Sequence, residues 1–142
     1  MKNCVFCKIS NHESPASIVY EDDWIMAFMD IRPVRPGMML TIPKGHVDHY
    51  CDITDDVAVK IAILGQRLAR NIRLKLSPER VGMVVHGYGV GHAHLLLIPL
   101  HGPDDITSAG FAFVQDGQVR FDLDRIPMAS RERLDELAIQ LK

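Results

Sequence analysis

The chain has 142 residues, of which 47% are hydrophobic and 24% charged, with a formal net charge of −2 at pH 7. These values predict one globular domain with a substantial core. The near-neutral charge argues against a nucleic-acid partner, and no apolar run approaches the length of a membrane span. Three cysteines and no apparent signal peptide predict a cytoplasmic protein rather than a disulfide-rich secreted one.

Cys4 and Cys7 form a pair of cysteines separated by two residues, and three interpretations are open. A redox motif with this spacing follows a strand inside a βαβ unit, and no strand pattern precedes this pair. A disulfide is disfavoured in the cytosol. Zinc requires two further ligands, usually Cys or His, which must come from elsewhere in the chain.

Three strands are predicted in the first third of the chain. Ser17–Glu21 and Trp24–Met29 are rich in apolar residues and form a hairpin around an acidic turn. The prolines and glycine between Asp30 and Gly37 predict a loop. Met38–Pro43 is the third strand, and Lys44-Gly45-His46 follows at its end.

A long helix is predicted from about Thr54 to Leu74, because Thr54 can cap it and two aspartates occupy its first turn. Its buried stripe is predicted to contain Val57, Ile61, Leu64, Leu68 and Ile72. Val81–His86 is predicted as a fourth strand, followed by a tight glycine-rich loop.

The stretch Gly91–Pro99 is apolar enough for a buried fifth strand. Because side chains alternate along a strand, His92, His94 and Leu96 are predicted to share one face. A buried imidazole without a partner is costly, so the two histidines are either paired in the core, bound to a metal, or part of a site. The five strands and the long helix predict an α+β fold with a five-stranded antiparallel sheet.

A last helix is predicted after Ser130, which can cap it. Its apolar face is formed by Leu134, Leu137, Ala138 and Leu141. That face is predicted to pack on the same domain or on a dimer partner.

Several short motifs, taken together and in order, resemble the histidine-triad family, in particular its hint-like bacterial branch. They are Cys-x-Phe-Cys-Lys-Ile, Val-Tyr-Glu-Asp-Asp, Ala-Phe-Met-Asp-Ile-x-Pro, Pro-Gly, Ile-Pro-Lys-Gly-His and His-x-His, and they extend over about residues 4 to 100. The resemblance implies a domain of residues 1–102, a C-terminal extension of residues 103–142, and a homodimer with a continuous sheet.

The resemblance also implies a structural zinc ion and a nucleotide site. The zinc ligands would be Cys4, Cys7, His46 and His92. The nucleophile that attacks the α-phosphate would be His94. The remaining substrate-binding residues would be Phe6, Ile9, Phe28 and Ile31 around the nucleoside, Asp30 on the ribose, and His86 near the phosphate. The expected ligand is a nucleotide, with a purine favoured.

The chain departs from the family pattern at imidazole positions. Leu96 stands where the third triad histidine is expected, and Met38 replaces another site histidine. Two hypotheses follow: a hydrolase or transferase acting on a nucleoside phosphoramidate or dinucleoside polyphosphate, or a weak or inactive nucleotide-binding or interaction protein with a structural zinc. His86 or His101 could replace the lost donors.

Overall fold

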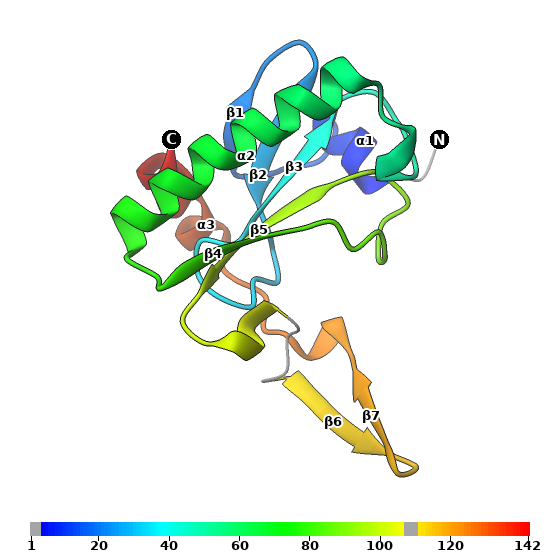
Figure 1. The fold of residues 1–142 in the computed structure, drawn as a ribbon, viewed down its shortest axis with the longest axis vertical. Coiled ribbons are helices and arrows are strands. Elements are labelled where there is room, and N and C mark those ends of the chain that lie inside the picture. Colours follow the sequence, from blue (N-terminus) through cyan, green and yellow to red (C-terminus); the bar gives the residue numbers. More distant parts are fainter. Residues whose placement is uncertain (1–3, 107–110) are drawn as a thin grey trace.

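The structure is a computed structural model that describes residues 4–106 and 111–142 (Figure 1). The helices are α1 (Val5–Ser10), α2 (Asp55–Leu76) and α3 (Arg131–Leu141), with the short 3₁₀-helices η1 (Tyr50–Asp52), η2 (Pro103–Ile106) and η4 (Leu123–Arg125). The strands are β1 (Ile18–Glu21), β2 (Ile25–Met29), β3 (Met39–Pro43), β4 (Arg80–Val84), β5 (Leu95–Leu100), β6 (Ala112–Gln115) and β7 (Gln118–Phe121).

Strands β1 to β5 form one antiparallel sheet in the order β1-β2-β3-β5-β4. The α+β fold class predicted from the sequence is therefore confirmed. Every residue of β2 and β3 is buried, because helices cover the sheet on both faces. The first two strands form the predicted hairpin, in which Asp22 accepts hydrogen bonds from the backbone N–H groups of Trp24 and Ile25.

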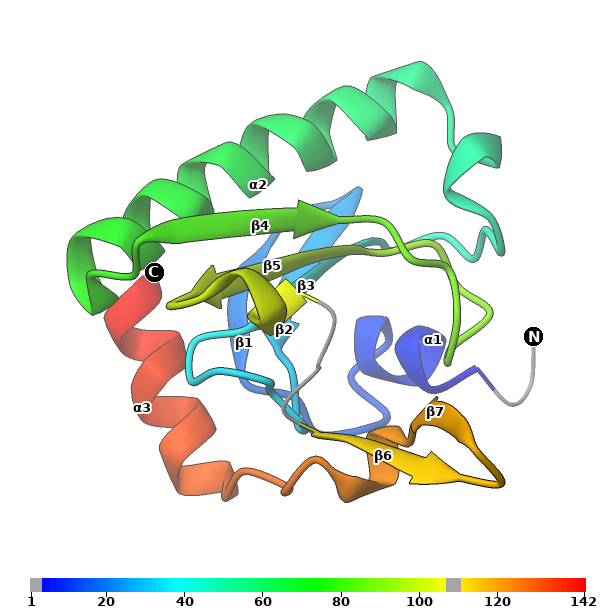
Figure 2. The same ribbon diagram turned by 60° about the horizontal axis from the view of Figure 1, so that its bottom comes forward.

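The two faces of the sheet carry separate apolar clusters, as period-two alternation requires. On one face, α2 and α3 cover Ala27, Met29, Met39, Leu95 and Leu97. On the other, α1 contributes Phe6 and Ile9, which pack with Met26, Phe28, Leu40 and Ile42. Figure 2 shows α2 and α1 on opposite sides of the sheet. The α1 cluster is the one next to the histidines that precede β5.

Helix α2 buries the predicted stripe, in which Ile61, Leu64, Leu68 and Ile72 are buried and Val57 is half-buried. Gly65 lies in this stripe, and a Cβ atom there would come within 2.9 Å of side-chain atoms of Leu95 and Met83. The absence of a side chain therefore lets the helix approach β4 and β5 closely. Thr54 is the N-cap residue as predicted, but its side chain makes no capping hydrogen bond.

One helix was missed, and the boundaries of two predicted strands are wrong. The chain around Cys4–Ser10, for which no helix was predicted, forms α1. The fourth strand ends at Val84, so His86 lies in the following loop. The fifth strand begins only at Leu95 and continues through Pro99 to Leu100, so His92 and His94 precede the strand. The alternation predicted for them still holds, because both rings pack against Phe6 while Ala93 belongs to the α2 cluster.

The C-terminal extension adds a hairpin and a helix to this sheet. Ser130 caps α3, since its hydroxyl accepts a hydrogen bond from the N–H of Arg133. The four predicted apolar residues of α3 are buried in the α2-side cluster. The hairpin of β6 and β7 projects away from the sheet (Figures 1 and 2). In the described residues, no helix combines the length and apolar character needed to cross a membrane.

Candidate functional site

Four side chains from three parts of the chain meet next to α1. They are Cys4, Cys7, His46 and His92, the predicted metal ligands, and their ligand atoms all lie within 4.8 Å of one another. The cluster combines two thiols and two imidazoles, which is a complete tetrahedral set for zinc. These residues could therefore bind a metal ion.

The spacing of the ligand atoms fits one central ion. With zinc–sulfur and zinc–nitrogen bonds of about 2.3 and 2.05 Å, a tetrahedral site places sulfur and nitrogen about 3.6 Å apart. The Nδ1 atom of His92 lies 3.4 Å from the Cys4 sulfur and 3.6 Å from the Cys7 sulfur. The Cys7 sulfur is 3.3 Å from Nδ1 of His46. All three distances are within a few tenths of an ångström of the tetrahedral value.

The surroundings of His92 prepare it for metal binding. Its ring is fully buried, and its Nε2–H donates to the carbonyl of Pro43 over 2.9 Å. A carbonyl can only accept, so Nδ1 is left with its lone pair toward the cysteines. Burial lowers the pKa of His92 and outweighs the hydrogen bond to Pro43. Burial therefore favours the neutral imidazole, which is the form that binds a metal.

Helix α1 brings the two cysteines together. Cys4 is its N-cap, and the Cys4 sulfur accepts a hydrogen bond from the Cys7 N–H at 3.5 Å. Burial, with a further contribution from Cys4, raises the pKa of the Cys7 thiol. Ser10 fastens the other end of the helix, because its hydroxyl lies 3.1 Å from the Cys7 carbonyl and 3.3 Å from that of Lys44. The helix therefore holds both thiols against the end of β3.

His94 has a fixed ring orientation. Its Nδ1–H donates to the backbone carbonyl of His92 over 2.7 Å, which places the unprotonated lone pair on Nε2. The edge of Phe6 packs against the ring with centroids 5.5 Å apart. The side chain is only 5% exposed. An imidazole held in this way can present Nε2 as a nucleophile without losing rotamer freedom at the moment of reaction.

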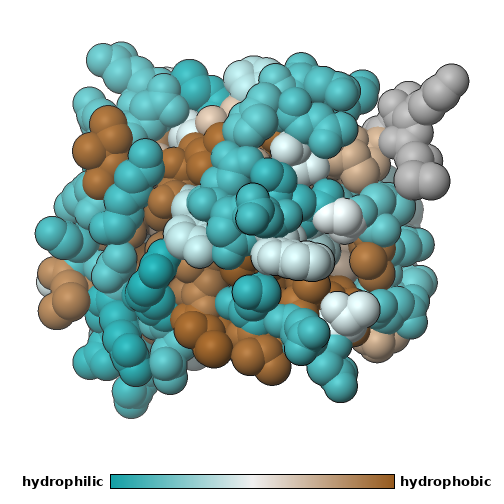
Figure 3. All heavy atoms as spheres, turned by 90° about the horizontal axis from the view of Figure 1, so that it is seen from above, coloured by the Kyte–Doolittle hydropathy of each residue, from teal (hydrophilic) through white to brown (hydrophobic). Residues whose placement is uncertain are grey.

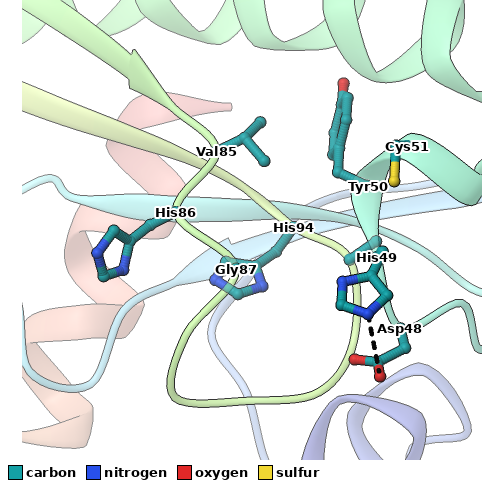
Figure 4. Close-up of a pocket in the computed structure, with 9 residues that line it drawn as sticks. Asp48, His49, Tyr50, Cys51, Val85, His86, Gly87 and His94 are labelled. Carbon is teal, nitrogen blue, oxygen red and sulfur yellow. Dashed lines mark ion pairs between the residues drawn. The ribbon is translucent and has the colours of Figure 1, made fainter.

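A pocket of about 340 Å³ adjoins His94. It is lined by residues 48–51 before α2, residues 85–87 after β4, Ala93 and His94. In the close-up, His86 and His49 lie on opposite sides of His94, and Asp48 pairs with His49 over 3.8 Å (Figure 4). His86, which was predicted as a substrate-binding residue, lines this pocket. His49 lines it as well, but it was not predicted. Its position after the Ile-Pro-Lys-Gly-His motif is the only sequence signal that it gives.

The predicted nucleoside residues lie on the α1 side of His94. Phe6 and Phe28 pack edge to face at 5.4 Å, and both, like Ile9, are buried in the α1 cluster. Ile31 is 45% exposed and offers apolar surface to a ligand. None of these four lines the pocket beside His86, so the α1 side of His94 and the pocket are lined by different residues.

Asp30 directly follows β2 and lies close to His94. Its carboxylate accepts a hydrogen bond from the N–H of Arg32 at 2.8 Å, which forms an Asx-type turn. Burial raises the pKa of Asp30, against the smaller lowering effects of that N–H and of His94. Carboxyl groups with a shifted pKa are concentrated at functional sites, so the raised pKa supports Asp30 as a candidate site residue.

Apolar side chains occupy the two positions at which the resemblance predicted imidazoles. Leu96 lies on β5 opposite Leu40 and Val84 and packs against the α1 cluster. Met38 is buried, and its sulfur accepts a hydrogen bond from the N–H of Val34 at 3.4 Å. Neither side chain can donate a proton or a hydrogen bond to a phosphate. His101 is exposed, and its backbone N–H binds Asp105.

Comparison with known proteins shows which family has this fold. Residues 11–102 match the model of the HIT domain. The chain belongs to the histidine-triad (HIT) family. The HIT fold is associated with nucleotide binding and hydrolase activity, and the present chain has that fold.

Relatives of the HIT family resemble the chain over most of its length. The protein "hit" of Bacillus subtilis is 33% identical over 138 residues, which cover 94% of this chain and 95% of that protein. A zinc-bound histidine-triad protein of Mycobacterium smegmatis has a TM-score of 0.69 at 29% identity, covering 99% of this chain and 96% of that one. Adenosine 5′-monophosphoramidase HNT1 of Saccharomyces cerevisiae is 35% identical over 98 residues, or 68% of this chain and 61% of that protein.

Proposed function

We propose that the chain is a nucleotide hydrolase or nucleotidyltransferase that attacks the α-phosphate of a nucleoside phosphoramidate or dinucleoside polyphosphate. The observation that carries the proposal is the hydrogen bond from His94 Nδ1 to the His92 carbonyl, which leaves Nε2 as the nucleophilic nitrogen. The similarity to a yeast adenosine 5′-monophosphoramidase supports this substrate class and a purine base.

The reaction has two steps. Nε2 of His94 forms a bond to the α-phosphorus while the bond to the leaving amine or phosphate breaks, and water or another acceptor then cleaves the nucleotidyl-histidine. An amine leaving group must gain a proton, and the imidazoles of His86 and His49 line the same pocket. Phe6, Ile9, Phe28 and Ile31 would surround the nucleoside, and Asp30 would accept hydrogen bonds from the ribose.

We further infer that the metal bound by the Cys4 cluster is zinc and that its role is structural. Two thiolates and two imidazoles close a tetrahedral site and leave no position for substrate. The zinc-bound relative from Mycobacterium smegmatis supports the identity of the metal.

A homodimer is also part of the proposal. Strand β4 is an edge of the sheet, and its exposed side includes Met83, with Val85 just beyond its end. Val59 and Ile63 are exposed on α2, and Figure 3 shows apolar surface among hydrophilic side chains on the face that α2 crosses. Pairing of two β4 edges would cover an open row of backbone groups and this apolar surface together.

The decisive experiment is mass spectrometry of the intact protein after incubation with adenosine 5′-phosphoramidate. Wild type should gain the mass of an adenylyl group transiently, and His94→Ala should not. His12→Ala is the matched control, because His12 is an exposed histidine paired with Glu21 at the end of α1 and should leave the adduct unchanged.

A second candidate function is supported by Leu96 and Met38, which remove two imidazoles. A chain with fewer donors for the developing charge could bind nucleotides with little or no turnover. Binding of adenosine 5′-monophosphate, with neither adduct nor turnover on phosphoramidates and dinucleoside polyphosphates, would favour this nucleotide-binding function.

A further inference from the structure

The loop between β2 and β3, residues 30–38, is held by the C-terminal extension at both of its ends. Near the start of the loop, the N–H of Ala129 donates to the Ile31 carbonyl over 2.9 Å. Near its end, Arg35 binds Asp105 through Nε and Nη2, each 2.8 Å from Oδ1. The loop that carries Asp30 and Ile31 is therefore fixed by residues outside the matched HIT domain.

Arg32 makes the most direct link between the two. Its Nη1 donates to the carbonyls of Asp124 at 3.0 Å and Ile126 at 2.7 Å, and its Nη2 lies 3.4 Å from the Asp124 carboxylate. The segment that provides these two carbonyls is anchored by a buried side chain, because Ile126 is only 2% exposed. A guanidinium holds its donors in a rigid planar fork, whereas a lysine ammonium is a point charge on a flexible stem and does not fix the same geometry.

The same residue contacts Asp30. The backbone N–H of Arg32 donates to Oδ1 of Asp30 at 2.8 Å, so the side chain of Arg32 holds the extension while its backbone holds the carboxylate. The orientation of Arg32 thus sets the direction of the Asp30 oxygens. A shift of the loop would turn this N–H away and leave the half-buried Asp30 carboxylate without its donor.

Arg35 reinforces this arrangement from the other end. Asp105 is buried, and its second oxygen accepts hydrogen bonds from the backbone N–H groups of His101 at 2.7 Å and Gly102 at 3.1 Å. These two residues directly follow β5, the strand that begins after His94. The loop is therefore tied to the extension and to the end of β5.

We propose that the C-terminal extension is part of the nucleoside site and that Arg32 is the residue through which it positions Asp30 for the ribose hydroxyls. This inference rests on the proposed ribose role of Asp30. It assigns to Arg32 a positioning function, since its side chain binds the extension and its backbone binds the carboxylate.

The test is the discrimination between two ligands by calorimetry: adenosine 5′-monophosphate and its 2′,3′-dideoxy analogue, each titrated into the full chain. Arg32→Ala should weaken the ribonucleotide by about tenfold, the scale of one lost hydrogen bond to a charged group. It should weaken the dideoxy analogue much less, so that the Kd ratio, defined as the Kd of the dideoxy analogue divided by that of the ribonucleotide, falls. Arg32→Lys should lower the ratio in the same direction, and it keeps a variant available if Arg32→Ala does not fold.

Two further variants separate the possible causes. Arg125→Ala is the matched control, because that guanidinium stacks on Phe113 at 3.5 Å and pairs with Asp122, both within the extension; its Kd ratio should equal that of wild type. Asp30→Ala is the reference and should abolish discrimination. If Asp30→Ala does so while both Arg32 variants keep the wild-type ratio, the positioning role is wrong and the ribose role stands. If Asp30→Ala keeps the ratio, the ribose role itself is wrong.

Discussion

The Nδ1–H of His94 donates to the backbone carbonyl of His92 across 2.7 Å, while the ring of His92 takes part in the cysteine–histidine cluster. One residue therefore contributes its side chain to the candidate metal site and its backbone to the orientation of the candidate nucleophile. Two adjacent sites with different chemistry share a single short segment, and substitutions can separate them.

Replacing Cys7 by serine should remove the metal. The hydroxyl is a poor zinc ligand, and three ligands do not complete the tetrahedral set, so zinc measured by elemental analysis should fall from about one per chain to near zero. The melting temperature should fall as α1 loses its attachment to the sheet. Cys51→Ser is the control, because Cys51 is an exposed free cysteine outside the cluster. Full zinc occupancy in Cys7→Ser would contradict the assignment.

His92→Ala and His94→Ala should have different consequences. His92→Ala loses a metal ligand and the hydrogen bond to Pro43, so both zinc content and thermal stability should fall. His94→Ala should retain zinc and a near-native melting temperature but form no nucleotidyl adduct. Nucleotide affinity should survive in His94→Ala, because Asp30 and the apolar residues remain. Loss of zinc from His94→Ala would show that the two sites are not separable.

Leu96→His should increase turnover on a nucleoside phosphoramidate. Leu96 packs on the same face of the sheet as the Phe6 cluster, to which His94 is also adjacent. One well-placed donor at developing charge contributes about 10²–10³ in rate, so an imperfectly placed one should give about tenfold. Ile139→His is the control, since Ile139 is exposed on α3, whose buried residues pack in the α2-side cluster. An equal increase in both variants would exclude a positional effect.

Asp30→Asn should stabilise the protein at neutral pH. Burial raises the pKa of Asp30 in the folded state, whereas the unfolded chain ionises near its reference value of about 3.9. Above the raised pKa, the folded protein holds an ionised, half-buried carboxylate, which lowers the free energy of unfolding. Below about 3.9 both states are protonated, and the cost disappears.

The gain from Asp30→Asn should therefore be full at pH values above the raised pKa and shrink as the pH falls through it. Urea unfolding at several pH values measures it. Asp23→Asn, at an exposed turn, should change stability little at any of them. A gain that grows toward acid pH would mean that the pKa of Asp30 is lowered rather than raised.

The sheet and α2 could be predicted because their apolar periodicity is continuous and bounded by turn residues, as in Met38–Pro43 and Thr54–Leu74. The metal ligands could be named only through the resemblance, since Cys4 and His92 are 88 residues apart and spacing alone does not join them. The cytoplasmic location and the homodimer stay predictions.

The missed features depend on tertiary contacts. Helix α1 has 6 residues, too short to show a helical period, and it is held by Ser10 and the cysteines rather than by propensity. His92 and His94 continue the alternation of β5, but the backbone N–H of Ala93 between them bonds to the carbonyl of Val47, which lies beyond the end of β3. Arg32 gave no signal, because its partners are backbone carbonyls far along the chain.

The four cluster residues come from separate parts of the chain, so they meet only when the strands between them pair in the native register. The amount of bound metal therefore reports on that register. His46 follows β3 and His92 precedes β5, and these strands pair through Thr41 and Leu95. A slip of one residue between them would turn every side chain of β5 to the opposite face and carry the His92 ring away from the cysteines. The zinc content of any preparation, compared with its protein concentration, would then count the molecules in which β3 and β5 have found their native partners.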